Sequence, residues 1–305
     1  MKFRPKFTPV AGRSDDRHAT EYAEPNALDQ PIGRLMRDAM MITDKQVEAI
    51  LLHQRDHGTR FGEAAVALGL ATYEDVTWAL SKQFHYPYAH GAQQIHPELI
   101  LASNPFGPEA EVFRELRSQL MMGVLAPGGA RYALAVLSPD VGDGKTYVAA
   151  NLAVAFSQLG GSGTLLIDAD MRSPRQHQLF GIEPDVSGLS SVLSGRAEIS
   201  VMQPLRDLPS LHVLSVGASP PNPLELVQRP GFGSLISELL GRFDHVVVDT
   251  PAASQGADSR VIAAACGAAL VIGRKGRSRM HSMSALLKAL SKGPSKVAGV
   301  VMNEH

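Results

Sequence analysis

The sequence predicts an α/β domain with a mostly parallel sheet flanked by helices, preceded by a small all-α module. Two observations support this prediction. In the C-terminal part, continuously apolar runs alternate with helical patterns, which is typical of parallel strands buried on both faces. The N-terminal part has only helical periodicity and repeats itself, since "IGRLMRDAMMITDKQVEAILLHQ" is followed by the similar "FGEAAVALGLATYEDVTWALSKQ".

The apolar runs that we expect to form strands are "YALAVL", "TLLIDAD", "LHVLSVG", "DHVVVDT", "AALVIG" and "VAGVVMN". Strands that alternate with helices imply right-handed crossovers between parallel neighbours. Ligands of such sheets bind at the carboxyl ends of the strands. The residues that follow these runs are therefore the first candidates for a functional site.

Four segments are predicted from changes in pattern along the chain. Residues 1–27 are polar and lack periodicity, so we expect a flexible arm. Residues 28–90 form the helical repeat module, in which "TDKQ" and "TYED" each resemble a capping box. Residues 91–108 are rich in Gly, Pro and polar side chains and predict a linker, and residues 109–305 form the α/β domain.

Charge and cysteine usage narrow the classes of partner and compartment. The chain has 29 basic and 30 acidic residues and a formal net charge of -1, so no global field favours nucleic acid. The single cysteine, Cys266, excludes an internal disulfide framework and suits a reducing cytoplasm. We find no apolar run of the length that a membrane span needs. We therefore expect a cytoplasmic protein with no nucleic acid partner.

The stretch "SPDVGDGKT" lies between a predicted strand and a predicted helix, as a phosphate-binding loop does. Pro139 stands where such a motif has its first glycine, which only opens the turn. The later amides and the helix N-terminus surround the phosphates, while a lysine reaches the outer ones and a hydroxyl meets Mg²⁺. The predicted binding residues are Val141, Gly142, Asp143, Gly144, Lys145, Thr146 and Tyr147. The alternative is a tight turn with a solvent-facing lysine.

Acidic residues end two of the predicted strands. "TLLIDADMR" supplies Asp168 and Asp170, with Arg172 next on the same alternation, and "HVVVDTPA" supplies Asp249. If both strands flank the loop strand, the three acids converge where a metal and the terminal phosphate lie. The alternative for each acid is to cap the following turn or helix.

Together these residues resemble the cytoplasmic bacterial tyrosine kinases of polysaccharide export, relatives of the MinD/ParA P-loop ATPases. The resemblance covers residues 109 to about 303 and includes "EVFRELRSQL", "LLIDADMRSPRQHQLFG", "GLSSVLSG", "SPPNPLELV" and "VVVDTPA". It implies a P-loop NTPase fold and transfer of phosphate from ATP, with Mg²⁺, to tyrosine. The implied function is regulation of exopolysaccharide polymerisation, export and chain length.

The resemblance also implies a role for each site residue. Lys145 belongs to the Walker A motif, Asp168 and Asp170 to the Walker A′ motif, and Asp249 to Walker B. Asp168 is the predicted proton acceptor, and Arg172 is grouped with the nucleotide-binding residues. Thr146, Asp170 and Asp249 form the predicted metal site.

Partners follow from the same resemblance. The family's E-x-x-R-x-x-R helix matches Glu111, Arg114 and Arg117, which share one helical face and would meet a neighbouring subunit in a homo-oligomer. The alternative is a solvated charged face with intrahelical pairs. The family's activator is a membrane chain-length protein, so we expect a separate transmembrane partner whose cytosolic tail holds this chain at the inner membrane.

Two features of the chain depart from the family pattern. The chain ends "GVVMNEH" without the usual tyrosine cluster, and Tyr22 in the predicted arm is the most accessible alternative acceptor. Ser138 to Asp143 contains no lysine, unlike the signature loop of partitioning ATPases. Two other functions stay open: a MinD-like ATPase switch without tyrosine kinase activity, and a nucleotide- or cyclic di-GMP-gated adaptor.

The N-terminal repeat resembles the paired-motif domains of type II secretion and pilus assembly ATPases. "RFGEAAVALGLATYEDVTWALSKQFHYPY" matches closely, whereas Pro31 and Met40 stand where Arg and Gly are expected. Some such domains bind cyclic di-GMP, and here Arg60 would be the main contact. The alternative, which we prefer, is a helical docking module without a ligand.

Overall fold

The computed structural model describes residues 32–40, 42–72, 75–76, 78–79, 96–159, 163–183, 187–199, 202–205 and 208–304. The predicted flexible arm and part of the predicted linker lie outside these residues. Within them, no helix is both long and apolar enough to cross a bilayer.

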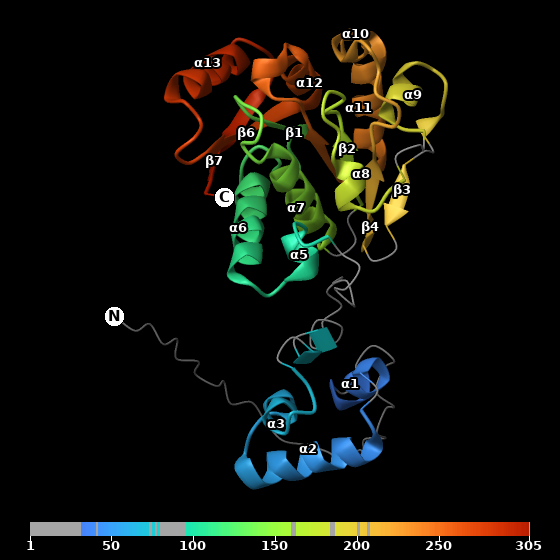
Figure 1. The fold of residues 1–305 in the computed structure, drawn as a ribbon, viewed down its shortest axis with the longest axis vertical. Coiled ribbons are helices and arrows are strands. Elements are labelled where there is room, and N and C mark those ends of the chain that lie inside the picture. The colour runs from blue at the N-terminus through green and yellow to red at the C-terminus, as the bar shows by residue number, and fades with distance from the viewer. Residues whose placement is uncertain are drawn as a thin grey trace, which may run out of the picture.

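A seven-stranded sheet organises the C-terminal part of the described chain, in the order β3-β4-β2-β5-β1-β6-β7 (Figure 1). All neighbours are parallel except β3, which runs antiparallel to β4 at one edge. The strands are β1 (Ala133–Leu137), β2 (Thr164–Asp168), β3 (Gln203–Leu205), β4 (Leu208–Leu214), β5 (His245–Asp249), β6 (Gly267–Arg274) and β7 (Lys296–Asn303). Each of the six predicted apolar runs overlaps one of the parallel strands, so the predicted fold class is confirmed.

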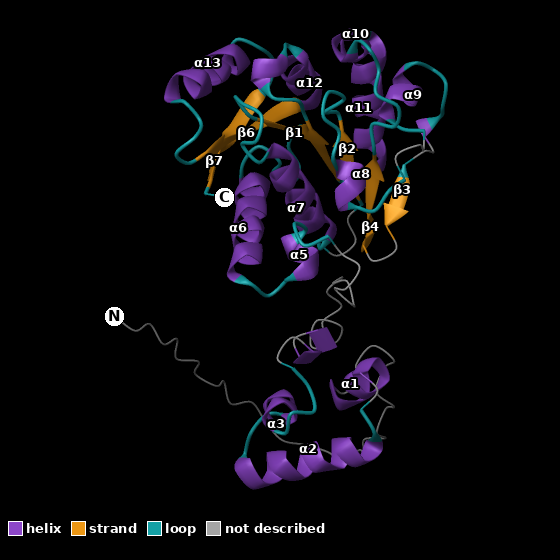
Figure 2. Cartoon of the chain, in the orientation of Figure 1, coloured by secondary structure: helices purple, strands orange, loops and turns teal. Residues whose placement is uncertain are grey.

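Helices cover both faces of this sheet (Figure 2). One face carries α5 (Ile100–Ser103), α6 (Pro108–Met122) and α7 (Lys145–Ser157). The other carries α10 (Pro223–Gln228), α11 (Pro230–Arg242), α12 (Asp258–Cys266) and α13 (Met280–Ser291). Short helices α8 (Gln176–Leu179) and α9 (Leu189–Leu193) and the 3-10 turn η3 (Ala253–Gln255) lie in the connections.

Strand β1 shows why the apolar runs are continuous. Ala135 and Leu137 belong to the core on the α12 side, whereas Leu134 and Val136 belong to the core on the α7 side. Because successive side chains of a strand point to opposite faces, a strand with helices on both sides needs apolar residues at every position. All five residues of β1 are fully buried.

The order of the strands differs from one expectation. The acids were predicted to converge if both acid-bearing strands flank β1, but only β5 does, and β2 lies on the far side of β5. The acids still meet, because Asp168 is in register with Asp249, which is in register with Val136 of β1. Which strands lie next to each other depends on long-range packing, for which a short stretch of sequence carries no signal.

The helical module contains α1 (Ile32–Met40), α2 (Asp44–His57) and α3 (Phe61–Ala67). Met36, Ile50 and Ala64 are fully buried in its small core. The capping box predicted at "TDKQ" is confirmed, since the Gln46 N–H donates to the Thr43 hydroxyl and the Thr43 N–H donates to the Gln46 side chain. The same reciprocal bonds join Thr72 and Asp75.

The predicted linker range, 91–108, includes residues that pack on the α/β domain. Helix α5 lies against α7, and Leu99 and Leu101 are buried there. Asn151 of α7 accepts a hydrogen bond from the Leu101 N–H and donates one to the Glu98 carbonyl. Composition suggested a linker because Gly and Pro surround a single turn of helix, which is too short to show periodicity.

Candidate functional site

The loop between β1 and α7 is held in shape by contacts within the chain. Gly142 and Gly144 adopt φ angles of 83° and 100°, which favour glycine. The buried Asp143 carboxylate accepts hydrogen bonds from the Asp140 N–H, at 2.9 Å, and from the Ser278 hydroxyl, at 2.8 Å. Pro139 does not disturb the turn, and its carbonyl accepts a hydrogen bond from the Ser254 N–H. The loop's shape is therefore set before any ligand arrives.

A second layer of polar side chains supports this loop from β6 and β7. The Arg274 guanidinium donates to the Gly142 carbonyl at 3.2 Å, and the Asn303 amide donates to the Asp143 carbonyl at 3.2 Å. Arg274 and Asn303 also line the cavity, so these two bonds fix the loop at the cavity wall.

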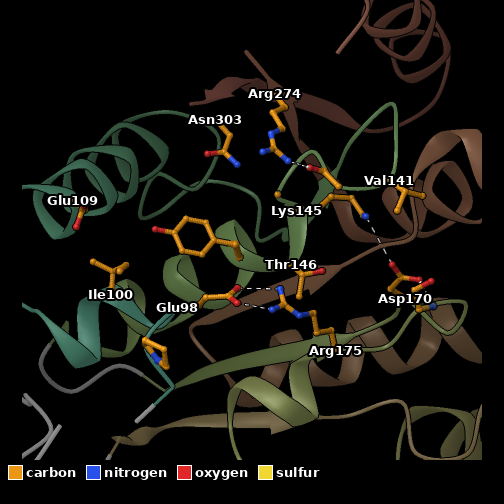
Figure 3. A pocket seen from close by; sticks show the side chains of 15 residues that line it. Glu98, Ile100, Glu109, Val141, Lys145, Thr146, Asp170, Arg175, Arg274 and Asn303 are labelled. Atoms are coloured by element: carbon orange, nitrogen blue, oxygen red, sulfur yellow. Dashed lines mark hydrogen bonds and ion pairs between the residues drawn. The ribbon is translucent and has the colours of Figure 1, made fainter. Parts of the chain in front are cut away.

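A cavity of about 620 Å³ lies over this loop and the start of α7 (Figure 3). It is large enough for a small organic ligand. Its lining is formed by Pro97, Glu98, Ile100, Glu109, Val141, Gly142, Gly144, Lys145, Thr146, Tyr147, Asp170, Ser173, Arg175, Arg274 and Asn303. Six of the seven predicted loop residues line it, and Asp143 instead supports the loop from behind.

Lys145 and Asp170 form the charged centre of the cavity. The Lys145 ammonium lies 3.8 Å from a carboxylate oxygen of Asp170, and both side chains are nearly fully buried (Figure 3). The other oxygen of Asp170 accepts hydrogen bonds from the backbone of Arg172 and Ser173. The lysine does not face solvent, which disfavours the simple tight-turn alternative.

Asp168 does not line the cavity. One of its carboxylate oxygens accepts the Asp170 N–H, and the other accepts the N–H groups of Arg175 and Gln176, at 3.0 to 3.1 Å. Burial, with the nearby Asp249 charge, holds the pKa of Asp168 well above its usual range, although these N–H donors counteract the rise. In this geometry Asp168 fixes the turn after β2.

Asp249 has one oxygen engaged and one without a partner. Its Oδ2 accepts a hydrogen bond from Gln176 Nε2 at 2.9 Å. The buried Oδ1 has no hydrogen bond of normal geometry among the described residues, although the Thr146 hydroxyl is close enough to lower the pKa of this carboxyl. Burial raises the pKa of Asp249 to about 6, and the Lys145 charge opposes that rise. Oxygen donors from Thr146, Asp170 and Asp249 gathered near this atom fit a hard divalent cation. The predicted metal-site residues are therefore brought to one edge of the sheet.

The sequence model of one protein family, described as "CobQ/CobB/MinD/ParA nucleotide binding domain", matches residues 134–305. This chain belongs to that family. The match begins within β1 and includes the loop, Asp168, Asp170 and Asp249.

Relatives place the chain among the bacterial tyrosine-protein kinases of the family. Tyrosine-protein kinase wzc of Salmonella typhimurium is 32% identical over 206 residues, which cover 68% of this chain and 28% of Wzc. Putative tyrosine-protein kinase CapB of Staphylococcus aureus is 31% identical over 206 residues, which cover 68% of this chain and 89% of CapB. The chain thus spans little more than a quarter of Wzc but most of CapB.

Solved structures agree with this placement. The chimerical protein CapA2B2 has a TM-score of 0.63 and 31% identity, with 77% of this chain and 99% of that chain covered. MinD of Pyrococcus horikoshii, solved with Mg-ADP, has a TM-score of 0.50 and 22% identity, with 58% of this chain and 71% of that chain covered. At that identity MinD shares the fold alone, and the kinases are the nearer relatives.

Arg172 of this CobQ/CobB/MinD/ParA family member does not line the cavity. Its guanidinium donates to both oxygens of the buried Asp258 carboxylate, at 3.2 and 3.0 Å. A Cβ on Gly256 would lie 2.6 Å from that carboxylate, so the pair is closely packed. The predicted nucleotide contact of Arg172 stays a prediction, because Asp258 engages the side chain here.

Glu98 and Arg175 are among the cavity-lining residues that the sequence did not predict. Arg175 forms two hydrogen bonds with the Glu98 carboxylate, at 2.9 and 2.5 Å, across the floor of the cavity (Figure 3). Glu98 precedes α5 in the range that composition assigned to the linker. The signal for Arg175 was its place in "RSPRQHQ", directly after the predicted acids.

The predicted oligomer helix α6 uses two of its arginines within the chain. Arg114 bonds to Glu111 and to the Pro105 carbonyl, and Arg117 donates to the Ala155 carbonyl at 2.6 Å. These contacts match the intrahelical alternative in part, and Glu111 stays exposed. The homo-oligomer stays a prediction.

The candidate acceptor and ligand residues outside the cavity differ in what the structure describes. Tyr22, the candidate acceptor, lies outside the described residues. Tyr147, by contrast, lines the cavity and packs edge-on against Phe113. Burial, with Glu109 and Glu98 nearby, raises the pKa of Tyr147. Arg60 is exposed at the start of α3, and its proposed contact with cyclic di-GMP stays a prediction.

Replacing Gly144 by alanine is expected to damage the loop. A Cβ there would lie 2.2 Å from Asn303 Nδ2, at a φ of 100° that L side chains rarely adopt. The backbone strain costs about 1–2 kcal/mol. Displacing Asn303 from the Asp143 carbonyl costs about 1 kcal/mol more. We expect urea unfolding to show both losses and nucleotide binding to disappear.

Gly128→Ala is the matched control for that variant. Gly128 has a φ of 79° with nothing within 4 Å of its Cβ position, so this change introduces strain without a clash. Equal stability losses in the two variants, with nucleotide binding retained in both, would contradict the close fit of Asn303 to the loop.

Proposed function

We propose that this chain transfers the terminal phosphoryl group of ATP to tyrosine hydroxyls and so regulates the polymerisation, export and chain length of an exopolysaccharide. One observation supports this most: a preformed phosphate-binding loop with a buried lysine and the cavity-lining Asp170 opposite it. The names of Wzc and CapB support tyrosine as the acceptor. Membership of a nucleotide-binding family supports the nucleotide.

The loop residues would bind and orient the triphosphate. The amides of Gly142 and Gly144, which both line the cavity, would hold its oxygens, and the N-terminus of α7 would add its positive end. The Lys145 ammonium, now beside Asp170, would move a short way to the transferred group and stabilise its developing charge. The hydrogen bonds from Arg274 and Asn303 would keep the loop in this conformation while it holds the charged triphosphate.

The acidic residues would hold Mg²⁺, together with the Thr146 hydroxyl. Mg²⁺ supplies charge neutralisation between the outer phosphates when it is bound. The unpartnered Oδ1 of Asp249 is the atom of this chain best suited to face the cation's inner hydration shell. Asp170, at the cavity side, would take part through a water of the cation, which leaves its carboxylate able to accept a proton.

The tyrosine hydroxyl must lose its proton, because a phenol with a pKa near 10 is a weak nucleophile at neutral pH. Asp168 is the acceptor that the family resemblance favours. Asp170 is the acid that lines the cavity, and it reaches an incoming hydroxyl without any change in the turn. We propose Asp170 as the proton acceptor and Asp168 as the residue that positions it through the Asp170 N–H.

The whole protein's setting follows from the same proposal. Wzc extends far beyond the matched region, whereas CapB extends little beyond it. We propose that this chain, like the family it resembles, works with a separate transmembrane chain-length protein and is held at the inner membrane by that partner's cytosolic tail. Assembly of copies through the Glu111, Arg114 and Arg117 helix is part of this proposal.

The direct test incubates the purified chain with γ-labelled ATP and a tyrosine-containing acceptor peptide, with Mg²⁺ or with EDTA. Label on phosphotyrosine, in the chain or the peptide, only when Mg²⁺ is present is the expected result. Free phosphate without phosphotyrosine would overturn the kinase in favour of an ATPase switch. Neither product, with nucleotide still bound, would indicate a gated adaptor.

A further inference from the structure

Gln176 lies at the junction of the three motifs that form the site. It is fully buried, and its side-chain amide donates to Asp249 Oδ2 at 2.9 Å and to the Thr146 carbonyl at 3.1 Å. Its backbone N–H donates to Asp168 at 3.0 Å. One residue thus contacts the turn after β2, the end of β5 and the start of α7.

The chemistry of its partners fixes how the Gln176 amide is turned. A carboxylate oxygen and a backbone carbonyl only accept hydrogen bonds, so both N–H bonds of the amide must face them. The carbonyl oxygen, Oε1, must then face the other way. That atom is buried and has no donor among the described residues.

Two acceptor atoms of this pair have no hydrogen bond of normal geometry among the described residues, Oε1 of Gln176 and Oδ1 of Asp249, and the Thr146 hydroxyl is the donor near the second. A buried polar atom without a partner costs about 1–3 kcal/mol, so two in the same cluster indicate that something else supplies the donors. The nearest charged donor, Lys145, is beside Asp170 instead. Water molecules bound to a cation are strong donors and match a cluster made only of acceptors.

We propose that Gln176 is a positioning residue for the Mg²⁺ site, an inference that rests on the proposed Mg-ATP function. Its N–H groups hold Asp249 Oδ2, which leaves Oδ1 as the oxygen that faces the cation. Outer-shell partners of this kind typically change metal affinity by roughly 10–100-fold when they are removed.

The test measures how much Mg²⁺ is needed for half-maximal binding of a fluorescent ATP analogue to the full chain. Gln176→Leu keeps the volume and removes the amide, and we expect it to raise that Mg²⁺ concentration at least about tenfold. Binding of the analogue in EDTA is expected to stay as in the unaltered chain. A purely structural role would weaken binding in both conditions alike.

Gln178→Leu is the matched control, because Gln178 lies on the same short helix α8 and is exposed. If Gln176→Leu does not fold, Gln176→Asn keeps an amide that is too short to reach both partners, and the same shift is expected. An unchanged Mg²⁺ requirement in either folded variant overturns the inference alone. If the unaltered chain binds the analogue equally well with and without Mg²⁺, the metal-dependent function fails and this inference fails with it.

Discussion

Lys145→Met is expected to abolish phosphotyrosine formation while leaving the fold intact. The ammonium is the one cation that the structure places between the loop and Asp170 among the described residues, and its removal leaves the developing charge unbalanced. Loss of one charge-stabilising donor typically costs about 10²–10³ in rate. Methionine fits the buried volume, so the melting temperature should change little. Phosphotyrosine immunoblotting with γ-labelled ATP measures the first effect and calorimetry the second.

Lys288→Met is the control for this variant. Lys288 is exposed on α13, remote from the cavity-lining residues, so the same chemical change should leave phosphotyrosine at the level of the unaltered chain. Phosphotyrosine that persists in Lys145→Met would show that another group performs the transfer.

Replacing Asp168 or Asp170 by asparagine is expected to have different effects, on stability in the first case and on phosphoryl transfer in the second. Asp168→Asn places an NH₂ group against backbone N–H donors that the carboxylate now accepts, and each lost charge-assisted bond costs about 1.5–3 kcal/mol. Asp170→Asn keeps the oxygen that accepts from Arg172 and Ser173 and loses only the charge that faces Lys145. We expect the first variant to lose stability and the second to lose about 100-fold or more in phosphoryl transfer with its stability retained.

Urea unfolding and initial rates of peptide phosphorylation separate these outcomes. A stable but inactive Asp168→Asn, together with an active Asp170→Asn, would return the proton-accepting role to Asp168. The two variants are isosteric and only two residues apart, so each serves as the control for the other.

The parallel sheet could be predicted because its strands carry their own signal. A strand buried on both faces must be apolar at every position, and β1 shows this in five consecutive residues. Strand β3 lacked the signal, because it is a three-residue edge strand whose pairing depends on β4. Helix α5 was missed for a similar reason, since four residues cannot show a helical period.

The sequence predicted only those site residues that belong to a short contiguous motif or end a recognisable strand. Lys145 and Thr146 belong to a contiguous motif, and Asp170 and Asp249 end recognisable strands. Gln176 gave no such signal, because its importance comes from Thr146, 30 positions earlier, and Asp249, 73 positions later. The pairing of Arg172 with Asp258 spans 86 positions, and the local pattern suggested a ligand contact instead.

The stretch from residue 96 to Ser103 has a practical consequence for anyone who studies the catalytic domain alone. A polypeptide that starts at residue 109, where composition first suggested a boundary, would omit Leu99, Leu101 and Glu98. It would expose part of the apolar surface of α7 to water and remove two of the three hydrogen bonds that the Asn151 side chain makes with described residues. It would also remove the Glu98 carboxylate that Arg175 contacts. A truncated protein intended for crystallisation or nucleotide titration should begin no later than His96.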